Sequence, residues 1–177
     1  PEMTDVGGTT LSTDATGGWL AEQSWFDPPL SQGTGGGVSA LFERPEWQQD
    51  VTVNRGAGQR LTPDIAAVAD PFTGVKIVFN QQVVVGGGTS LAAPVWAGLT
   101  ALMNQYLKQR GGRSLGDLNP LLYRVAEGAP LPAFRDVTLG GNAVEVAQPG
   151  YDLVTGLGTP DIHNLVQNLL VAQRLSE

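Results

Sequence analysis

The sequence predicts an α/β fold in which strands alternate with helices around a sheet that is at least partly parallel. Short apolar segments bounded by proline and glycine indicate strands, and they flank one long apolar segment with helical spacing. The 177 residues suit a single domain with an ample core. The 24 glycines, 12 prolines and only 15% charged residues favour a turn-rich globular protein over a helical bundle or a disordered segment.

The first half of the chain is expected to hold several strands and one long loop. Residues 2–11 predict a short strand interrupted by a glycine pair, and residues 17–37 predict a loop of the length that often lines a cleft. A short turn or helix is expected over 46–49, with Trp47 packed inward. Residues 61–70, with prolines at 63 and 71, resemble one buried strand.

A hairpin and three helices are expected in the remainder. Residues 75–79 and 82–85 flank Asn80-Gln81, which indicates a tight turn. The apolar spacing predicts a helix over 91–109 that ends at a basic, glycine-rich stop, with Pro94 near its first turn. Two further helices are expected at 119–126 and 160–174.

Charge and composition exclude several classes of partner. Ten basic residues against 17 acidic ones give a net charge of −7, and no Lys/Arg cluster could follow a phosphate backbone, so we expect no nucleic-acid partner. No apolar run is long enough to span a membrane, so we expect no membrane partner either. The lack of cysteine excludes disulfides and thiol catalysis.

Ser90 is the residue that points most clearly to chemistry. It follows the glycine run at 86–88 and opens the long helix, beside backbone N–H groups and the positive end of a helix dipole. This is a suitable setting for a serine nucleophile, which needs a base. The single histidine, His163, lies in a polar turn typical of a surface or helix-start position, so we do not expect an internal Ser-His-Asp triad.

Several segments together resemble a known peptidase family. Gly-Thr-Ser-Leu-Ala-Ala-Pro at 88–94 matches the signature around the nucleophile of subtilisin-like peptidases. The other matching segments are Val-Gly-Gly-Thr-Thr-Leu (6–11), Gly-Gly-Gly-Val-Ser (35–39), Arg-Leu-Thr-Pro-Asp-Ile (60–65), Arg-Asp-Val-Thr (135–138) and Gly-Tyr-Asp-Leu-Val-Thr-Gly-Leu-Gly-Thr-Pro (150–160). In this order and over the whole chain, they resemble the sedolisin, or serine-carboxyl peptidase, family. The resemblance implies the C-terminal portion of a single catalytic domain with a subtilisin-like three-layer fold and a mainly parallel central sheet.

The resemblance also implies a mechanism. In sedolisins the serine pairs with a glutamate that is supported by an aspartate, and a further aspartate helps to form the oxyanion hole. A carboxylate can accept a proton in acid, where imidazole is already protonated, so we expect a secreted, acid-active endopeptidase that acts on peptides or proteins through an acyl-enzyme on Ser90. In that family the segments carrying the three carboxylates precede Val-Gly-Gly-Thr-Thr. We therefore expect this chain to be inactive alone and to need the N-terminal portion of the same enzyme as its partner.

A calcium site is the second implication of the resemblance. Asp136 and Asp152 would supply carboxylate oxygens, and Val137, Gln148 and Gly150 would supply carbonyl oxygens, which are the hard ligands that Ca²⁺ prefers. The family usually has glycine where Gln148 stands. The site would lie in a loop region at about 135–152 and would tie it to the C-terminal helix.

Alternatives remain at this point. Asp64 is interpreted as structural, paired with Arg60 or bonded to backbone, rather than as catalytic, and Glu43 and Glu46 as solvated. A catalytically inactive, calcium-stabilised binding module is an alternative function, and so is a histidine-dependent subtilisin whose histidine lies upstream. A nucleotide-binding loop at 86–90 is disfavoured, because Thr89 stands where that loop needs lysine.

Overall fold

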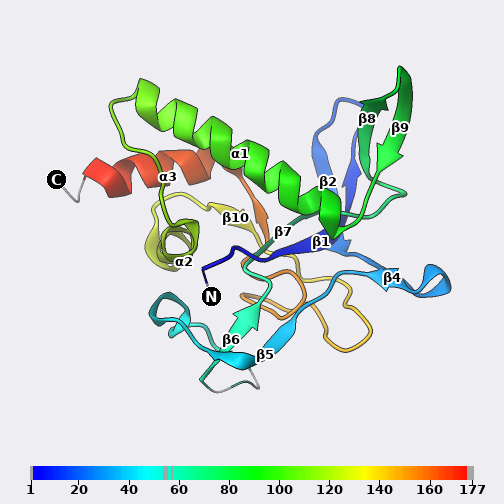
Figure 1. The fold of residues 1–177 in the computed structure, drawn as a ribbon, viewed down its shortest axis with the longest axis horizontal. Coiled ribbons are helices and arrows are strands. Elements are labelled where there is room, and N and C mark those ends of the chain that lie inside the picture. Colours follow the sequence, from blue (N-terminus) through cyan, green and yellow to red (C-terminus); the bar gives the residue numbers. More distant parts are fainter. Residues whose placement is uncertain (1, 54–55, 57, 175–177) are drawn as a thin grey trace.

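The computed structural model describes residues 2–53, 56 and 58–174 (Figure 1). Its helices are α1 (Thr89–Gln109), α2 (Leu118–Gly128) and α3 (Ile162–Arg174), with short 3₁₀ turns at Pro28–Leu30 and Glu46–Gln48. The strands are β1 (Val6–Thr13), β2 (Trp19–Ser24), β3 (Phe26–Asp27), β4 (Gln32–Gly33), β5 (Gly37–Glu43), β6 (Gln59–Thr62), β7 (Ile65–Val68), β8 (Val75–Phe79), β9 (Gln82–Gly86), β10 (Phe134–Arg135) and β11 (Thr159–Pro160). In the described part of the chain, no helix is both long and apolar enough to cross a membrane.

A three-stranded sheet in the order β2-β1-β7 forms the centre of the molecule. β1 and β7 run parallel, with Val6 opposite Ile65, whereas β1 and β2 pair antiparallel. α1 lies across β1 and β7 (Figure 1). The predicted α/β class is confirmed, although β1–β7 is the one parallel pair among the described strands and the other sheets are antiparallel pairs.

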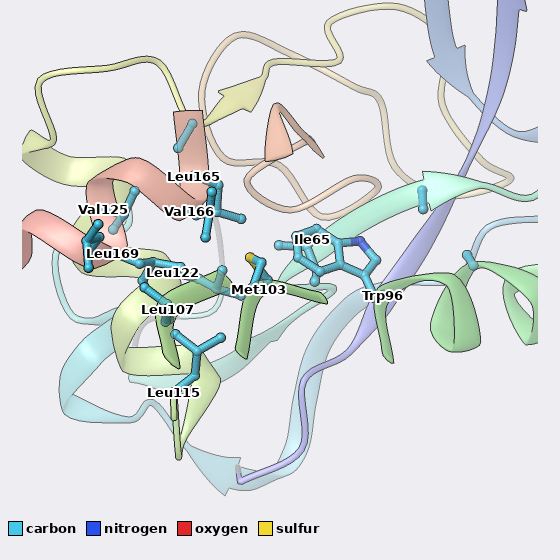
Figure 2. Close-up of a cluster of buried hydrophobic side chains, with 14 of the residues drawn as sticks. Ile65, Trp96, Met103, Leu107, Leu115, Leu122, Val125, Leu165, Val166 and Leu169 are labelled. Atoms are coloured by element: carbon cyan, nitrogen blue, oxygen red, sulfur yellow. The ribbon is translucent and has the colours of Figure 1, made fainter. Parts of the chain in front are cut away.

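The buried core lies where the three helices meet the sheet (Figure 2). α1 contributes Trp96, Met103 and Leu107, which face Leu122 of α2 and the Leu165–Leu169 stretch of α3. The indole N–H of Trp96 donates to the carbonyl of Ala66 at 3.0 Å, which fixes α1 directly on β7. The helix that begins beside Ser90 is therefore held on the sheet through the buried core.

Two local predictions were wrong because distant pairing overrode local composition. Residues 17–37 form β2, a 3₁₀ turn and the β3–β4 ribbon instead of a continuous loop, since Trp19–Ser24 finds a partner in β1. Residues 61–70 form no single strand. Pro63 separates β6, which pairs with β5, from β7, which pairs with β1.

Other expectations are confirmed with small shifts. The hairpin β8–β9 turns at Asn80-Gln81, where both residues have positive φ (48° and 64°), as a two-residue hairpin turn requires. α1 starts at Thr89, so Pro94 lies in its second turn rather than its first. Trp47 packs partly buried against Tyr123, with ring centroids 4.8 Å apart.

Candidate active site

A glycine turn joins the hairpin to α1 and sets the position of Ser90. Gly88 has φ of 88° and its N–H donates to the carbonyl of Ala69 at 2.5 Å, so the turn is anchored just after β7. A side chain at Gly87 would meet Pro71 at 2.6 Å, which leaves no room for any larger residue. Glycine is therefore required at both positions, for conformation at Gly88 and for space at Gly87.

Ser90 is the second residue of α1 and is exposed. Among the described residues, no group hydrogen-bonds to its Oγ, and the backbone N–H groups of Thr89 and Ser90 have no acceptor. The first N–H groups of a helix have no hydrogen-bond partner within the helix, and they form the positive end of its dipole. They are thus available to stabilise an anion that forms beside the hydroxyl.

Pro94 also shapes this end of the helix. Proline has no backbone N–H, so the usual bond from residue 94 to the carbonyl of Ser90 cannot form. The first turn of α1 instead holds through Leu91 and Ala92, whose N–H groups donate to the carbonyl of Gly88 at 2.8 and 3.3 Å. Ser90 therefore lies in a helical turn that is held by hydrogen bonds to Gly88, the residue that precedes the helix.

The described residues offer no base within bonding distance of Ser90 Oγ. His163 is exposed at the second position of α3, which agrees with its interpretation as a helix-start residue. Asp64 is fully buried and its carboxylate is 2.6 Å from the Arg60 guanidinium, which confirms the structural interpretation. Glu43 and Glu46 are exposed, as expected for solvated carboxylates.

Asp64 is the centre of a buried polar network, in which the bond from Tyr123 is the part that the sequence did not predict. Its carboxylate accepts bonds from Arg60, from the Asp5 N–H at 2.8 Å and from the Tyr123 hydroxyl at 2.8 Å. Burial raises the pKa of the Asp64 carboxyl, although these three donors oppose the shift. For Arg60, burial opposes the charge, but the bond to Asp64 and its charge outweigh it, so the pKa of the guanidinium is raised.

The same network reaches the loop that follows β10. The N–H of Leu157 donates to the Asp64 carbonyl at 2.8 Å, and the Tyr151 hydroxyl donates to the Pro63 carbonyl at 2.8 Å. Burial raises the pKa of Tyr151 well above its ordinary value, so this phenol stays protonated. The loop around 150–157 is consequently fixed to the segment between β6 and β7.

Four of the five residues expected to bind calcium are joined in two hydrogen-bonded pairs in that loop region. The Gly150 N–H donates to Asp136 at 2.7 Å, and the Gln148 N–H donates to Asp152 at 3.1 Å. Asp152 is buried and also accepts bonds from the N–H groups of Val154 and Thr155, both at 2.8 Å. Burial raises the pKa of the Asp152 carboxyl, against the lowering effect of these backbone donors.

The oxygen donors in this loop suit a hard cation. Within the described ranges, the carbonyl oxygens of Val137, Gln148 and Gly150 accept no hydrogen bond, although Val137 is buried. The described residues contain no cluster of three or more histidine, cysteine or acidic side chains. A metal here would therefore depend on two carboxylates together with backbone carbonyls.

Fold and site together define an α/β protein that presents an exposed serine at the start of a helix packed against the core on one side. No protein-family model matches the chain. The chain is 41% identical over 181 residues to kumamolisin from Bacillus sp. (strain MN-32) and 36% identical over 173 residues to sedolisin from Pseudomonas sp. (strain 101). These alignments cover 96% and 93% of this chain but only 31% and 28% of those relatives.

A solved structure gives the same result. The structure of Pseudomonas sedolisin, a serine-carboxyl proteinase complexed with two molecules of pseudo-iodotyrostatin, matches with a TM-score of 0.80 and 34% identity. The match covers 93% of this chain and 45% of that one. The chain belongs to the sedolisin family, and its small sheets are consistent with part of a subtilisin-like domain.

Proposed function

We propose that this chain is the C-terminal portion of the catalytic domain of a secreted, acid-active serine-carboxyl endopeptidase. The observation that carries the proposal is the exposed Ser90 hydroxyl at the start of α1, next to two unpartnered backbone N–H groups. The relatives named above are peptidases, and this chain spans about a third of their length. The N-terminal portion of the same enzyme would supply the glutamate–aspartate base and the oxyanion aspartate.

Ser90 is proposed to attack the carbonyl carbon of a peptide substrate. Its proton passes to the carboxylate base, and the carbonyl oxygen takes the negative charge. The base then returns the proton to the leaving nitrogen, so that collapse of the intermediate breaks the C–N bond, releases the amine and leaves an acyl-enzyme. The N–H groups of Thr89 and Ser90 lie where they could donate to the oxyanion. Water then releases the acyl group. Without the carboxylates of the N-terminal portion, the serine is not activated, so the chain alone is expected to be inactive.

A peptide aldehyde labelled with ¹³C at its carbonyl tests this role of Ser90. In the enzyme that includes its N-terminal portion, the Ser90 hydroxyl should add to the aldehyde carbon, and the NMR signal should move from the aldehyde to the hemiacetal region. The Ser90→Ala variant is the control and should show no such signal. An unmodified aldehyde signal in the wild-type enzyme at saturating inhibitor would contradict the proposal.

We also propose that the 136–152 loop region binds Ca²⁺ through Asp136, Val137, Gln148, Gly150 and Asp152. The hydrogen bonds that join Asp136 to Gly150 and Gln148 to Asp152, together with the unpartnered carbonyl oxygens, support the assignment. Bound Ca²⁺ would neutralise two carboxylates and stabilise the fold, with no part in the chemistry at Ser90. This loop is hydrogen-bonded to the segment around Asp64, just before β7. Ca²⁺ that stabilises the loop would therefore also stabilise the position of β7.

Calcium removal should lower the thermal midpoint of the protein. A ligand present at about 100 times its dissociation constant contributes roughly 2.7 kcal/mol, so EGTA should lower the midpoint by several degrees, and Ca²⁺ but not Mg²⁺ should restore it. Asp136→Asn should remove this response and leave the turn around Asp152 intact, because Asp136 is exposed. An EGTA-treated wild type with an unchanged midpoint would count against the site.

A further inference from the structure

Three successive glycines lead the chain into α1, and they give the start of the helix no side chain to hold it in place. Because residues 86–88 have no Cβ, their backbone has more conformational freedom than that of other residues. An attacking group has to be placed accurately, since a displacement of about 1 Å can lower a rate about 100-fold. The position of Ser90 therefore depends on what packs against this glycine turn.

The turn at residues 70–73, which follows β7, supplies this support. A side chain at Gly87 would meet Pro71 at 2.6 Å, and one at Gly74 would meet the carbonyl oxygen of Gly86. The connection from β7 to β8 thus packs against the glycine turn at the N-terminal end of α1 (Figure 1). A shift of the 70–73 turn would consequently shift the residues that lead into the helix.

The Asp70 carboxylate fixes the shape of the 70–73 turn. Its Oδ1 accepts a bond from the Phe72 N–H at 2.8 Å, and the Thr73 N–H donates to the Asp70 carbonyl at 3.1 Å. Aspartate followed by proline is typical of such a turn, in which the carboxylate accepts from the backbone two residues ahead. Its Oδ2 accepts from the Thr10 hydroxyl at 2.8 Å, which ties the turn to β1. Asp70 is only 9% exposed, so water competes little for these bonds.

We propose that Asp70 is a positioning residue for Ser90. Its carboxylate holds the 70–73 turn in the shape that places Pro71 against Gly87, and this contact sets the start of the helix from which the serine attacks. Asp70 therefore acts through the turn and not through contact with the Ser90 hydroxyl. The inference rests on the proposed function, because it concerns the serine that the proposed reaction uses.

Two substitutions of Asp70 separate the hydrogen bonds of the carboxylate from its charge. In the enzyme that includes its N-terminal portion, Asp70→Ala should lower kcat about 10- to 100-fold and change KM less than about threefold, because the serine is displaced while substrate binding is kept. Asp70→Asn should stay within about threefold of the wild-type kcat, since its amide can accept from Phe72 and donate to the Thr10 oxygen. Thr10→Val removes only one of the two bonds and should lower kcat about fivefold.

Asp14→Ala is the matched control. The Asp14 carboxylate also shapes a turn, in which it accepts bonds from the N–H groups of Thr16 and Gly18, both at 2.8 Å. That turn joins β1 to β2, and these bonds stay within residues 14–18, so kcat should not change.

Two kinetic results would overturn the proposal. The first is a kcat within about twofold of the wild type for Asp70→Ala, or for Thr10→Val where Asp70→Ala does not fold. The second is an Asp70→Asn variant as impaired as Asp70→Ala, because the charge of Asp70, rather than the turn it holds, would then be what the reaction requires.

Hydrogen exchange tests the link between Asp70 and the glycine turn without relying on the reaction. In a Ser90→Ala background, which prevents self-cleavage, mass spectrometry follows the peptides that cover residues 83–92. Asp70→Ala should speed exchange of the Gly88 amide, which is bonded to the Ala69 carbonyl, at least about tenfold, and Asp14→Ala should not. Unchanged exchange in Asp70→Ala would also overturn the proposal. If exchange rises but the labelled aldehyde forms no hemiacetal at Ser90 in the wild type, the proposed function fails while the link stands.

Discussion

Replacement of Ser90 by alanine should abolish peptide hydrolysis by the enzyme that contains its N-terminal portion. Without its serine nucleophile, the enzyme keeps only the rate acceleration that comes from the oxyanion donors and from substrate binding. We therefore expect kcat to fall by at least about 10⁴-fold. The measurement is the cleavage rate of an internally quenched peptide in acid. KM should change little, because the hydroxyl contributes to the transition state more than to binding.

A matched control distinguishes chemistry from damage to the fold. Ser114 is exposed in the segment between α1 and α2, and its hydroxyl makes no hydrogen bond among the described residues, so Ser114→Ala should leave kcat unchanged. Both variants should keep the thermal midpoint of the wild type, since both hydroxyls are exposed. Residual hydrolysis by Ser90→Ala within about tenfold of the wild-type rate would remove Ser90 from the mechanism.

The position of Ser90 follows from signals that are local in the sequence. Gly88 must adopt a positive φ, Gly87 must pass Pro71, and the apolar spacing after Ser90 specifies a helix packed on β7. The contact of Gly87 with Pro71 joins positions 16 apart, whereas the conformation of Gly88 and the helical spacing after Ser90 are signals carried by neighbouring residues. For that reason the glycine turn, the β8–β9 hairpin and the start of α1 could be predicted to within about two residues.

Pairing between distant segments could not be predicted in the same way. Trp19–Ser24 becomes a strand because β1 offers it an edge, and nothing in its own glycine-rich surroundings indicates that partner. Likewise, β6 and β7 are continuous in sequence but belong to different sheets.

The predicted calcium ligands illustrate a third case. Asp136 and Asp152 are 16 positions apart, and as isolated residues they resemble ordinary loop aspartates. The structure brings each carboxylate against a backbone N–H of the same loop, at Gly150 and Gln148. That the two aspartates belong to one metal site is thus implied by resemblance to a family and could not be obtained from spacing.

The Asp64 network carries the largest stability effect that we expect in this chain. Arg60 and Asp64 have side-chain exposures of 4% and 0%, so Arg60→Met removes the cation and leaves a buried carboxylate without its partner. Breaking one side of such a pair costs about 3–5 kcal/mol, and methionine retains much of the packing against Trp47. Urea denaturation at neutral pH should show this loss. Arg135→Met is the control, because that half-exposed guanidinium, 3.4 Å from Asp161, should contribute less than about 1 kcal/mol.

The cost of Arg60→Met should shrink in acid, and this pH dependence identifies Asp64 as its source. Burial raises the pKa of Asp64 in the folded protein, and the positive charge of Arg60 partly opposes this shift. Without Arg60, the pKa of Asp64 in the folded variant should be higher still. When the pKa of a carboxyl is higher in the folded than in the unfolded state, its contribution to the free energy of unfolding is greatest below the unfolded pKa. This contribution is lost as the pH rises through the folded pKa. The variant should therefore approach the wild type as the pH falls towards the ordinary pKa of aspartate, about 4, because the buried Asp64, whose folded pKa is higher, is then neutral. A penalty that stays constant between neutral pH and about pH 4 would show that lost packing, rather than an unpaired carboxylate, destabilises the variant.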